Sequence, residues 1–248
     1  MLIVDRVEKS YNKGGLFSRK KQKIVKKVSF ECRNGECLGI IGESGSGKST
    51  LGRLILGIEK SDRGTVLFEG NRVEDRKVRL GNISAVFQDY ASSINPFFTV
   101  EEAIMEPLKA QKKDRKEFNN KINNLLSQVG LNPSYRKKYP HELSGGEIQR
   151  VCIARAISTE PKCILLDEAI SSLDVSVQKQ VLELLKELRK IYDMSYIFIT
   201  HDIQAAAYIC DRIIIFKDGQ IEEIAQIEQL KDVRSEYARK LLGMVVTF

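Results

Sequence analysis

The sequence predicts an α/β fold: a central, mainly parallel β-sheet with helices on its faces, a small antiparallel β region near the N-terminus, and an inserted helical lobe. Two observations predict this class. Short, continuously apolar runs alternate with segments of helical periodicity, and strand, helix, strand in that order requires a parallel sheet. Residues 92–158, between two such regions, change to a helical pattern throughout.

The N-terminal segment supplies the first strands. Residues 1–8 alternate enough to form an edge strand, and residues 24–31 predict a second one. Asn34 and Gly35 then predict a tight hairpin turn. Next, residues 37–41 form a short apolar run that indicates a buried strand of the central sheet.

Helices follow that strand. The first is expected over residues 48–57. In the helical lobe, three segments carry apolar residues at three- and four-residue spacing: residues 100–110, 115–129 and 147–158. The lobe is punctuated by Pro96, Pro133 and Pro140.

The central sheet resumes after this lobe. The pattern predicts, in order, a buried strand over residues 163–166, a helix over 176–192 and a strand over 196–200. Residues 217–220 form a hairpin turn between two further strands. We expect a single domain over residues 1–248, with residues 1–91 and 159–248 as the α/β catalytic core and residues 92–158 as the helical subdomain.

Composition excludes several classes of protein. The chain has 248 residues, 42% of them hydrophobic, and no run approaches the roughly 18 apolar residues that would cross a bilayer. Acidic residues close behind Met1 argue against a signal peptide. The five cysteines contain no CxxC pair, so we expect reduced core thiols. A membrane role would therefore come through partners, from the cytoplasmic side.

The net charge of +7 leaves two interpretations open. The excess is local, because six basic residues and no acid lie between Lys9 and Lys27. A solvated basic loop near lipid headgroups or a phosphate ligand explains this run as well as nucleic acid does.

A glycine-rich loop follows the strand at residues 37–41. It fits the pattern GxxxxGK(S/T) and opens a helix, which is the context that phosphate binding requires. Glycines let backbone N–H groups curl around phosphate oxygens, Lys48 bridges the terminal phosphates, and the Ser49 hydroxyl coordinates Mg²⁺. The predicted nucleotide-binding residues of this loop are Gly42, Glu43, Ser44, Gly45, Ser46, Gly47, Lys48, Ser49 and Thr50.

Two carboxylates and a histidine follow later strands of the sheet. Asp167 and Glu168 end the apolar run at residues 163–166, at the sheet edge where ligands bind in open α/β folds. Asp167 can hold Mg²⁺, and Glu168 can polarise the water that attacks the γ-phosphate. His201 follows the strand at residues 196–200, where it could orient that water, although a lone histidine is commonly structural.

A second anion-binding helix end is expected in the helical lobe. Leu143 and Ser144 precede Gly145, Gly146 and Glu147, and a serine with two glycines before a helix supplies free backbone N–H groups. The simpler interpretation is an N-cap. A single chain has little use for two phosphate-binding helix ends, however, unless a second copy brings them together.

These segments together resemble the ATPase subunits of ABC transporters over essentially the whole chain. Residues 42–50 resemble the Walker A loop, residues 143–147 the signature motif and residues 163–168 Walker B. Gln88 resembles the Q-loop glutamine, Asp174 belongs to a D-loop-like Ser172-Leu173-Asp174, and His201 resembles the switch histidine. The resemblance implies the fold of a P-loop ATPase and the cofactors ATP and Mg²⁺.

The resemblance also implies how the residues are used. A head-to-tail dimer would enclose each ATP between one Walker A loop and the other subunit's Ser144, Gly145, Gly146 and Glu147. The Mg²⁺ ligands would be Ser49, Gln88 and Asp167, the catalytic residues Glu168 and His201, and the dimer-communication residue Asp174. Tyr11 resembles the aromatic residue that stacks on adenine, although Phe17 could compete or Tyr11 could simply end a strand.

Finer features resemble the oligopeptide, dipeptide and nickel importer branch. They are the basic insertion at residues 14–21 and residues 88–96, 139–142 and 174–178. Tyr90 and Ala169 stand where that branch usually has proline, and Glu147 replaces a common glutamine. Peptide importers often carry a C-terminal extension with cysteines, and this sequence ends at Phe248 without one, which favours nickel, another metal or a metal–chelator complex as substrate over oligopeptides.

The expected function is therefore ATP hydrolysis that energises an importer. The implied partners are a second, non-identical ATPase subunit, two transmembrane permease subunits and, indirectly, an extracytoplasmic substrate-binding protein. The chain would lie peripherally on the cytoplasmic face of the membrane. The alternative is a non-transport ABC ATPase acting on nucleic acid or the ribosome, but the long coiled coil or second cassette usual there is missing, so no nucleic acid is expected.

Overall fold

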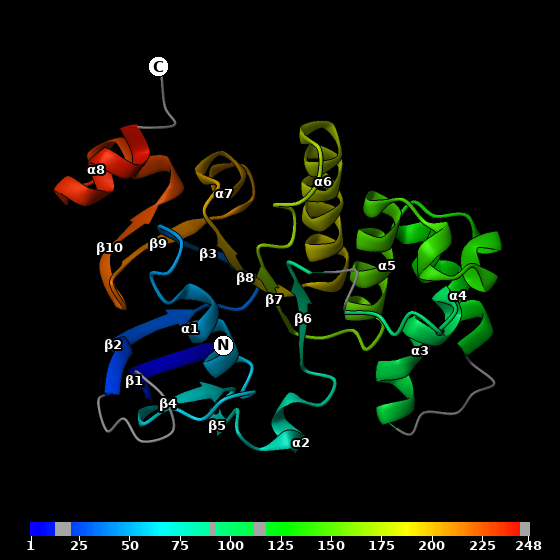
Figure 1. Cartoon of the computed structure of the whole chain (residues 1–248), viewed down its shortest axis with the longest axis horizontal. Helices are drawn as coiled ribbons and strands as arrows, with labels where there is room; N and C mark the ends of the chain where they lie inside the picture. The colour runs from blue at the N-terminus through cyan, green and yellow to red at the C-terminus, as the bar shows by residue number, and fades with distance from the viewer. Residues whose placement is uncertain (13–20, 90–92, 112–117, 244–248) are drawn as a thin grey trace. The chain divides into compact units, whose positions relative to one another are not determined.

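The computed structural model describes residues 1–12, 21–89, 93–111 and 118–243. The chain divides into two compact units (Figure 1): Met1–Arg79 together with Ser195–Phe248, and Leu80–Met194. The predicted helical subdomain, residues 92–158, lies within the second unit, which also includes strands on either side of it. Its boundaries remain a prediction.

One sheet of the first unit is antiparallel, with strand order β2-β1-β4-β5. Its strands are β1 (Leu2–Asn12), β2 (Lys21–Cys32), β4 (Arg63–Phe68) and β5 (Asn71–Arg72). In β2, the buried side chains of Val28, Phe30 and Cys32 alternate with exposed ones. This period of two buries one face of the sheet and leaves the other in solvent. The predicted antiparallel β region is thus confirmed.

The other sheet of the first unit is mainly parallel. β3 (Cys37–Ile41) pairs in parallel with both β8 (Ser195–Thr200) and β9 (Arg212–Lys217), and β10 (Gln220–Gln226) pairs antiparallel with β9. Every residue of β3 and β8 is buried, which explains why both sequences are largely apolar. The helical elements of this unit are α1 (Lys48–Ile55), α2 (Arg76–Arg79), α7 (Ile203–Ile209), η4 (Ile227–Asp232) and α8 (Glu236–Gly243).

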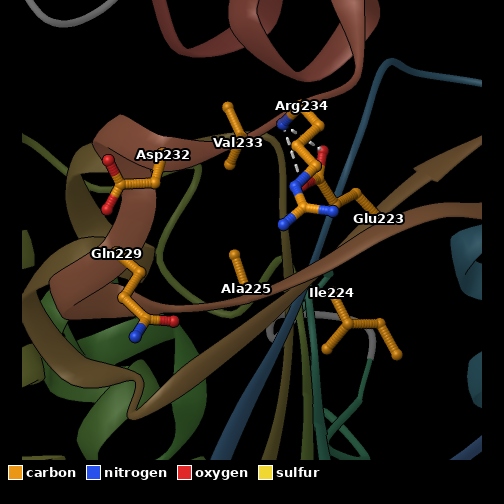
Figure 2. A pocket seen from close by; sticks show the side chains of 7 residues that line it. All are labelled: Glu223, Ile224, Ala225, Gln229, Asp232, Val233 and Arg234. Carbon is orange, nitrogen blue, oxygen red and sulfur yellow. Dashed lines mark hydrogen bonds between the residues drawn. The ribbon is translucent and has the colours of Figure 1, made fainter.

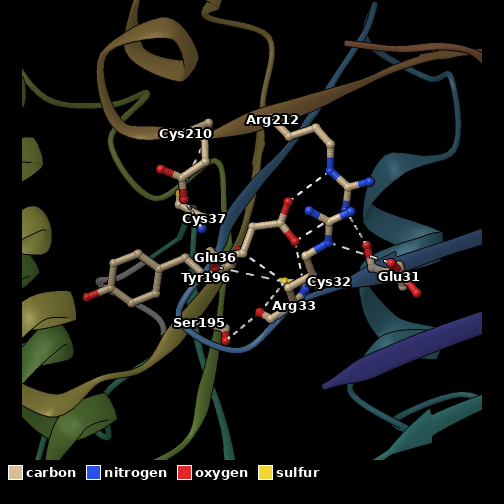
Figure 3. A network of polar contacts seen from close by, with 10 residues as sticks. Glu31, Cys32, Arg33, Glu36, Cys37, Ser195, Tyr196, Cys210 and Arg212 are labelled. Atoms are coloured by element: carbon tan, nitrogen blue, oxygen red, sulfur yellow. Dashed lines mark hydrogen bonds and ion pairs between the residues drawn. The ribbon is translucent and has the colours of Figure 1, made fainter. Parts of the chain in front are cut away.

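A polar network holds the start of β3 against its neighbours (Figure 3). Arg212 Nε donates to Glu36 Oε1 at 2.8 Å, and both side chains are nearly buried. The Gly35 N–H donates to Ser195 Oγ at 2.9 Å. That hydroxyl donates in turn to the Arg33 carbonyl at 3.0 Å. These contacts satisfy polar groups that burial would otherwise make costly, so the ends of β3, β8 and β9 are tied together.

The sheet topology at the turn before β3 differs from one prediction. Asn34 and Gly35 do form a turn, and Gly35 has a positive φ of 71°, but the turn is not a β-hairpin. β2 belongs to the antiparallel sheet and β3 to the parallel one. The turn therefore passes the chain from one sheet to the other, which local sequence does not distinguish from a hairpin.

The second unit combines two parallel strands with most of the helices. β6 (Ile83–Phe87) pairs with β7 (Cys163–Asp167). The helical elements are α3 (Val100–Ala110), α4 (Phe118–Gln128), η2 (Pro133–Lys137), η3 (Pro140–Glu142), α5 (Gly145–Ile157) and α6 (Val175–Tyr192). α3 begins with a reciprocal cap in which Thr99 and Glu102 each bond the other's backbone, and this explains its sharp start.

Helix ends differ slightly from the predicted ones. The helix expected from residue 147 begins at Gly145, because Ser144 is its N-cap. The helix expected to residue 57 ends at Ile55, and Gly57 follows with a φ of 59°. A glycine adopts this left-handed conformation readily, and so it ends the helix.

Two further expectations concern membranes and thiols. Within the described ranges, no helix is long and apolar enough to cross a bilayer. All five cysteines are buried, reduced thiols, and the sulfur atoms of Cys37 and Cys210 lie 3.7 Å apart. The cysteines therefore contribute to the core, as predicted.

Candidate functional site

The glycine-rich loop lies in the first unit, between β3 and α1. Lys48 is buried, and its Nζ donates to the carbonyls of Gly42 at 2.7 Å and Glu43 at 2.9 Å, so the ammonium group curls back over the loop. Gly45 and Gly47 have φ values of 79° and 105°, which L-residues with a Cβ adopt only under strain. The loop thus has the conformation and the cation that a phosphate group requires.

Two further features describe how this loop is packed and which polar atom it leaves buried. A Cβ at Gly42 would lie 2.0 Å from the Phe216 carbonyl oxygen, so the loop approaches β9 closely. Ser46 Oγ is buried and has no hydrogen-bond partner among the described residues. A buried hydroxyl without a partner is costly, and a phosphate oxygen would relieve that cost.

Tyr11 lies at the end of β1 in a charged cluster of the first unit. Its hydroxyl donates to Glu59 Oε2 at 2.5 Å, and Arg53 of α1 bonds the other carboxylate oxygen at 2.6 Å. Lys9 Nζ lies 5.5 Å from the centre of the Tyr11 ring. The hydrogen bonds from Tyr11 and Arg53 lower the pKa of Glu59 against the opposing effect of desolvation. Tyr11 is therefore tied to the helix that follows the phosphate loop, while Phe17 lies outside the described residues.

His201 is exposed, and it occupies the bend between β8 and α7. Its neighbours fix the backbone there. The Asp202 N–H donates to Thr200 Oγ1 at 3.0 Å, and the Asp202 carboxylate caps α7 by accepting the Ala205 N–H at 3.0 Å. His201 is thus presented at the carboxyl end of a buried strand, as expected.

In the second unit, Asp167 ends β7 and Glu168 follows it. Glu168 has a φ of 52°, uncommon for a residue with a side chain, and this costs of the order of 1 kcal/mol. Ser171 supports this conformation, because its N–H and Oγ both donate to the Glu168 carbonyl, at 3.2 Å and 2.9 Å. Strain of this kind is concentrated at functional sites, where the side chain must point in one direction.

Gln88 lies at the same edge of the β6–β7 pair. Phe87 is opposite Asp167 in the parallel register, so Gln88 and Glu168 each follow the last residue of neighbouring strands. Gln88 is exposed. Asp174, also exposed, is the N-cap residue of α6, although its side chain makes no capping hydrogen bond. The second unit therefore brings an amide and two carboxylates to one strand edge.

The predicted second anion site is the start of α5. Ser144 is its N-cap, and Glu147 completes a capping box: Ser144 Oγ accepts the Glu147 N–H, and the Glu147 carboxylate accepts the Ser144 N–H. A Cβ at Gly146 would lie 3.0 Å from Val177 Cγ1, so α5 begins close against α6. The N-cap interpretation is confirmed, and it does not conflict with a role in phosphate binding.

Two residues that support this region were not predicted from the sequence. Gln149 is fully buried, and its amide donates to the Ala169 carbonyl at 2.5 Å, which joins α5 to the segment just after Glu168. Tyr135 donates its hydroxyl to Glu147 Oε1 at 2.6 Å. The role of Gln149 could have been predicted, because it is a polar residue on the inward face of α5. No local signal predicts the role of Tyr135, because its hydrogen bond joins two separate elements, η2 and α5.

A polar hollow elsewhere in the first unit contains none of the predicted residues (Figure 2). It lies between β10 and the segment from η4 to α8, and Glu223 there accepts the backbone N–H of Arg234 and of Ser235. These bonds lower the pKa of Glu223 and anchor the start of α8. The hollow is thus a structural junction.

The first unit thus has a glycine-rich loop with the conformation of a phosphate-binding loop, and the second unit, by itself, has two carboxylates at the end of β7. Comparison with known proteins agrees. The family model described as ABC transporter matches residues 25–171. The chain is 52% identical to the metal-staphylopine import system ATP-binding protein CntF of Staphylococcus aureus, over 100% of both chains. It is 42% identical to the oligopeptide transport ATP-binding protein AppF of Bacillus subtilis, over 94% of this chain and 74% of that one.

A solved structure gives the same result. The chain resembles a dimeric ATP-binding cassette in a post-hydrolysis state bound to ADP and Pi, with a TM-score of 0.82 and 30% identity over 92% of this chain and 99% of that one. The predicted resemblance and α/β fold class are confirmed. The chain belongs to the ABC transporter family, and it is an ATP-binding, ATP-hydrolysing subunit of an importer.

Proposed function

We propose that this importer ATPase energises uptake of metal ions as complexes with a small organic chelator. The observation that carries the proposal is the 52% identity to the metal-staphylopine relative along its full length. The oligopeptide relative AppF is 42% identical and extends beyond the matched region, since 74% of it is covered. Oligopeptides are therefore the alternative substrate, and nickel is one candidate for the metal.

ATP would bind at residues 42–50. The buried, unpartnered Ser46 Oγ and the ammonium group of Lys48, held over the loop, support this placement. Phosphate oxygens would take over the carbonyl contacts of Lys48 and accept from backbone N–H groups at the start of α1. Tyr11 is proposed to stack on adenine, supported by its position beside α1 and its bond to Glu59.

The residues proposed for Mg²⁺ suit that ion. Ser49, Gln88 and Asp167 offer a hydroxyl, an amide and a carboxylate, and hard oxygen donors are what Mg²⁺ prefers. When bound, the ion would neutralise negative charge on the phosphate oxygens. Glu168 is proposed to accept a proton from the attacking water, and His201 to hydrogen-bond the γ-phosphate and orient that water. The constrained backbone at Glu168 supports its assignment.

The second helix end, at the start of α5, supports the proposal of a second ATPase subunit. Ser144, Gly145, Gly146 and Glu147 are proposed to contact ATP held by a second, non-identical ATPase subunit, and Asp174 to communicate across that dimer. Gln88 would link nucleotide state to two permease subunits at the cytoplasmic face of the membrane. A substrate-binding protein outside the membrane would deliver the chelate.

Uptake measurements in cells test the substrate. Cells carrying Glu168→Gln in the chromosomal copy are expected to lose accumulation of metal supplied with a chelator, measured by elemental mass spectrometry, and to keep growth on oligopeptides. The reverse pattern would favour the oligopeptide alternative. Hydrolysis by the purified chain that rises with added DNA or ribosomes would instead favour a non-transport ATPase.

A further inference from the structure

The first turn of α5 contains a carboxylate that is bonded to the functional serine. Glu147 Oε2 accepts the Ser144 N–H at 2.8 Å and the Ser144 hydroxyl at 2.9 Å. The other oxygen, Oε1, accepts the Tyr135 hydroxyl at 2.6 Å. Tyr135, Glu147 and Ser144 thus form a continuous chain of hydrogen bonds. The Ser144 hydroxyl, which is proposed to contact ATP, therefore already donates its hydrogen bond to Glu147 of the same subunit.

Tyr135 is held firmly in place for this contact. It lies in η2, whose Arg136 forms an ion pair with Glu101 of α3 at 2.8 Å and bonds Asn119 of α4 at 2.7 Å. Lys138 Nζ lies 3.8 Å from the centre of the Tyr135 ring, and the Lys138 carbonyl accepts the Val100 N–H. The tyrosine hydroxyl is therefore positioned by a framework that includes two other helices.

Glu147 is ionised in this setting. The hydrogen bond from Tyr135, followed by those from Ser144, lowers the pKa of the Glu147 carboxyl group. The same contact raises the pKa of the Tyr135 hydroxyl. A full negative charge consequently stands beside Ser144 at neutral pH, where a glutamine would carry none.

That charge opposes the binding of phosphate. A phosphate oxygen that accepts the Ser144 hydroxyl must displace Glu147 Oε2 from it, and would then lie roughly 5 Å from that oxygen. Two negative groups at this distance repel each other. The N–H groups of Gly145 and Gly146 remain available, since the first N–H groups of a helix have no acceptor within it.

We propose that Glu147 weakens the affinity of the α5 N-terminus for the phosphates of ATP, and that Tyr135 moderates this effect by donating to the Glu147 carboxylate. Both act as positioning residues through Ser144. The inference rests on the proposed function, because it assumes that this helix end meets the ATP of a second subunit. With Glu147, the α5 N-terminus would bind ATP phosphates less tightly, and would release them more readily, than the same helix end with glutamine at this position.

Two substitutions should act in opposite directions. Glu147→Gln removes the charge but keeps a side chain of the same shape, and is expected to tighten phosphate binding roughly threefold to tenfold. Tyr135→Phe removes the donor that spreads the carboxylate charge, and is expected to weaken binding roughly twofold. In the Glu147→Gln background, Tyr135→Phe should have no further effect, because its route through the carboxylate is gone.

The experiment uses the full chain and tripolyphosphate as probe. The amide signals of Gly145 and Gly146 are followed by NMR during titration, in a Lys48→Ala background that weakens binding at the glycine-rich loop. Glu142→Gln and Tyr139→Phe are matched controls. They change the same residue types nearby, and Glu142 there accepts the Tyr139 N–H instead of a group of Ser144. Both controls should bind the probe as the parent does. Thermal unfolding of every variant establishes that it is folded.

Unchanged or weaker binding by Glu147→Gln would overturn the inference, as would an effect of Tyr135→Phe that persists in the glutamine background. Neither result would contradict the proposed function of the protein as an importer ATPase. Glycine signals that respond in no variant would remove the phosphate role of this helix end altogether, and with it both the inference and the proposed second-subunit contact. Glu147→Asp, which keeps the charge, should retain the weak parental affinity.

Discussion

The chain offers two helix N-termini to phosphate, and they are built differently. α1 begins after Gly47, a left-handed residue, and no side chain caps it. α5 begins after Ser144 in extended conformation, with a complete capping box. No side-chain cap therefore competes with a ligand at α1, whereas the capping box at α5 already satisfies the N–H groups of Ser144 and Glu147 and leaves those of Gly145 and Gly146. A phosphate has to compete with Glu147 at α5 but meets the Lys48 cation at α1.

This difference indicates that the two helix ends contribute to ATP binding in different ways. The α1 end has a nearby cation and a buried hydroxyl that bonds to none of the described residues, so it is suited to hold ATP by itself. The α5 end is stable when empty, so it is suited to a contact that forms and breaks in each cycle. The predictions below test this contrast, from the largest expected effect to the smallest.

Glu168→Gln should separate binding from chemistry. We expect turnover to fall by roughly 10²–10⁴-fold, the usual contribution of a general base, while ATP binding at the α1 end stays intact. Phosphate release and equilibrium binding of labelled ATP measure the two quantities. Substantial hydrolysis by the purified variant would remove Glu168 from its assigned role.

Lys48→Ala should distinguish the two helix ends directly. Hydrogen bonds to charged groups contribute about 1.5–3 kcal/mol, so ATP affinity of the isolated chain should fall roughly tenfold to a hundredfold. Ser144→Ala should leave that affinity unchanged and reduce turnover, because Ser144 is proposed to act on ATP bound by the other subunit. Calorimetric titration with ATP checks both. Equal losses of affinity in the two variants would mean that one chain uses both ends on the same nucleotide.

Glycine substitutions test how tightly the loop at α1 is packed. Gly42→Ala places a Cβ 2.0 Å from the Phe216 carbonyl oxygen, so we expect a loss of roughly 2–4 kcal/mol in unfolding free energy. Gly45→Ala is the control, because a Cβ there meets nothing within 4 Å and only the positive φ is strained, at about 1 kcal/mol. Chemical denaturation measures both. A Gly45 variant less stable than the Gly42 variant would contradict the packing argument.

Ser144→Ala should also reveal the cap at α5. Loss of an N-cap serine typically costs about 1 kcal/mol, so a small fall in unfolding free energy is expected even without nucleotide. Ser44→Ala, in the exposed part of the loop before α1, should cost less, since no side chain caps that helix. Equal stability of Ser144→Ala and the parent would show that the capping box contributes little.

Burial predicts a further, smaller effect in the middle of α5. Desolvation raises the pKa of the Cys152 thiol from its ordinary value of 9.0 to about 11. Because the thiolate is the reactive form, its fraction at pH 8 falls by roughly a hundredfold. Alkylation of the native chain, followed by mass spectrometry of the Cys152 peptide, should be slow and should accelerate on unfolding. Rapid labelling of the native chain would mean that α5 opens locally.

Much of this protein was predictable from local sequence. The strand at Cys37–Ile41 and the helix at Val100–Ala110 have their predicted limits, because a continuous apolar run and a helix that starts at a capped threonine are strong local signals. The phosphate loop was equally clear, since its glycines and lysine are required by backbone conformation and charge. The turn at Asn34 and Gly35 was misread, because a turn looks the same locally whether or not its flanking strands pair.

The sequence by itself determined the chemistry: the residue types at the phosphate loop, the carboxylates after β7 and the serine before α5, each set by spacing of a few residues. Only the tertiary structure decided what those groups contact. The loop at Gly42 is packed against β9 and Ser46 Oγ has no hydrogen-bond partner among the described residues, while η2 brings the Tyr135 hydroxyl to the Glu147 carboxylate beside Ser144. Such contacts join elements distant in sequence or in different packing layers, and their energies depend on burial and direction, which spacing along the chain does not specify.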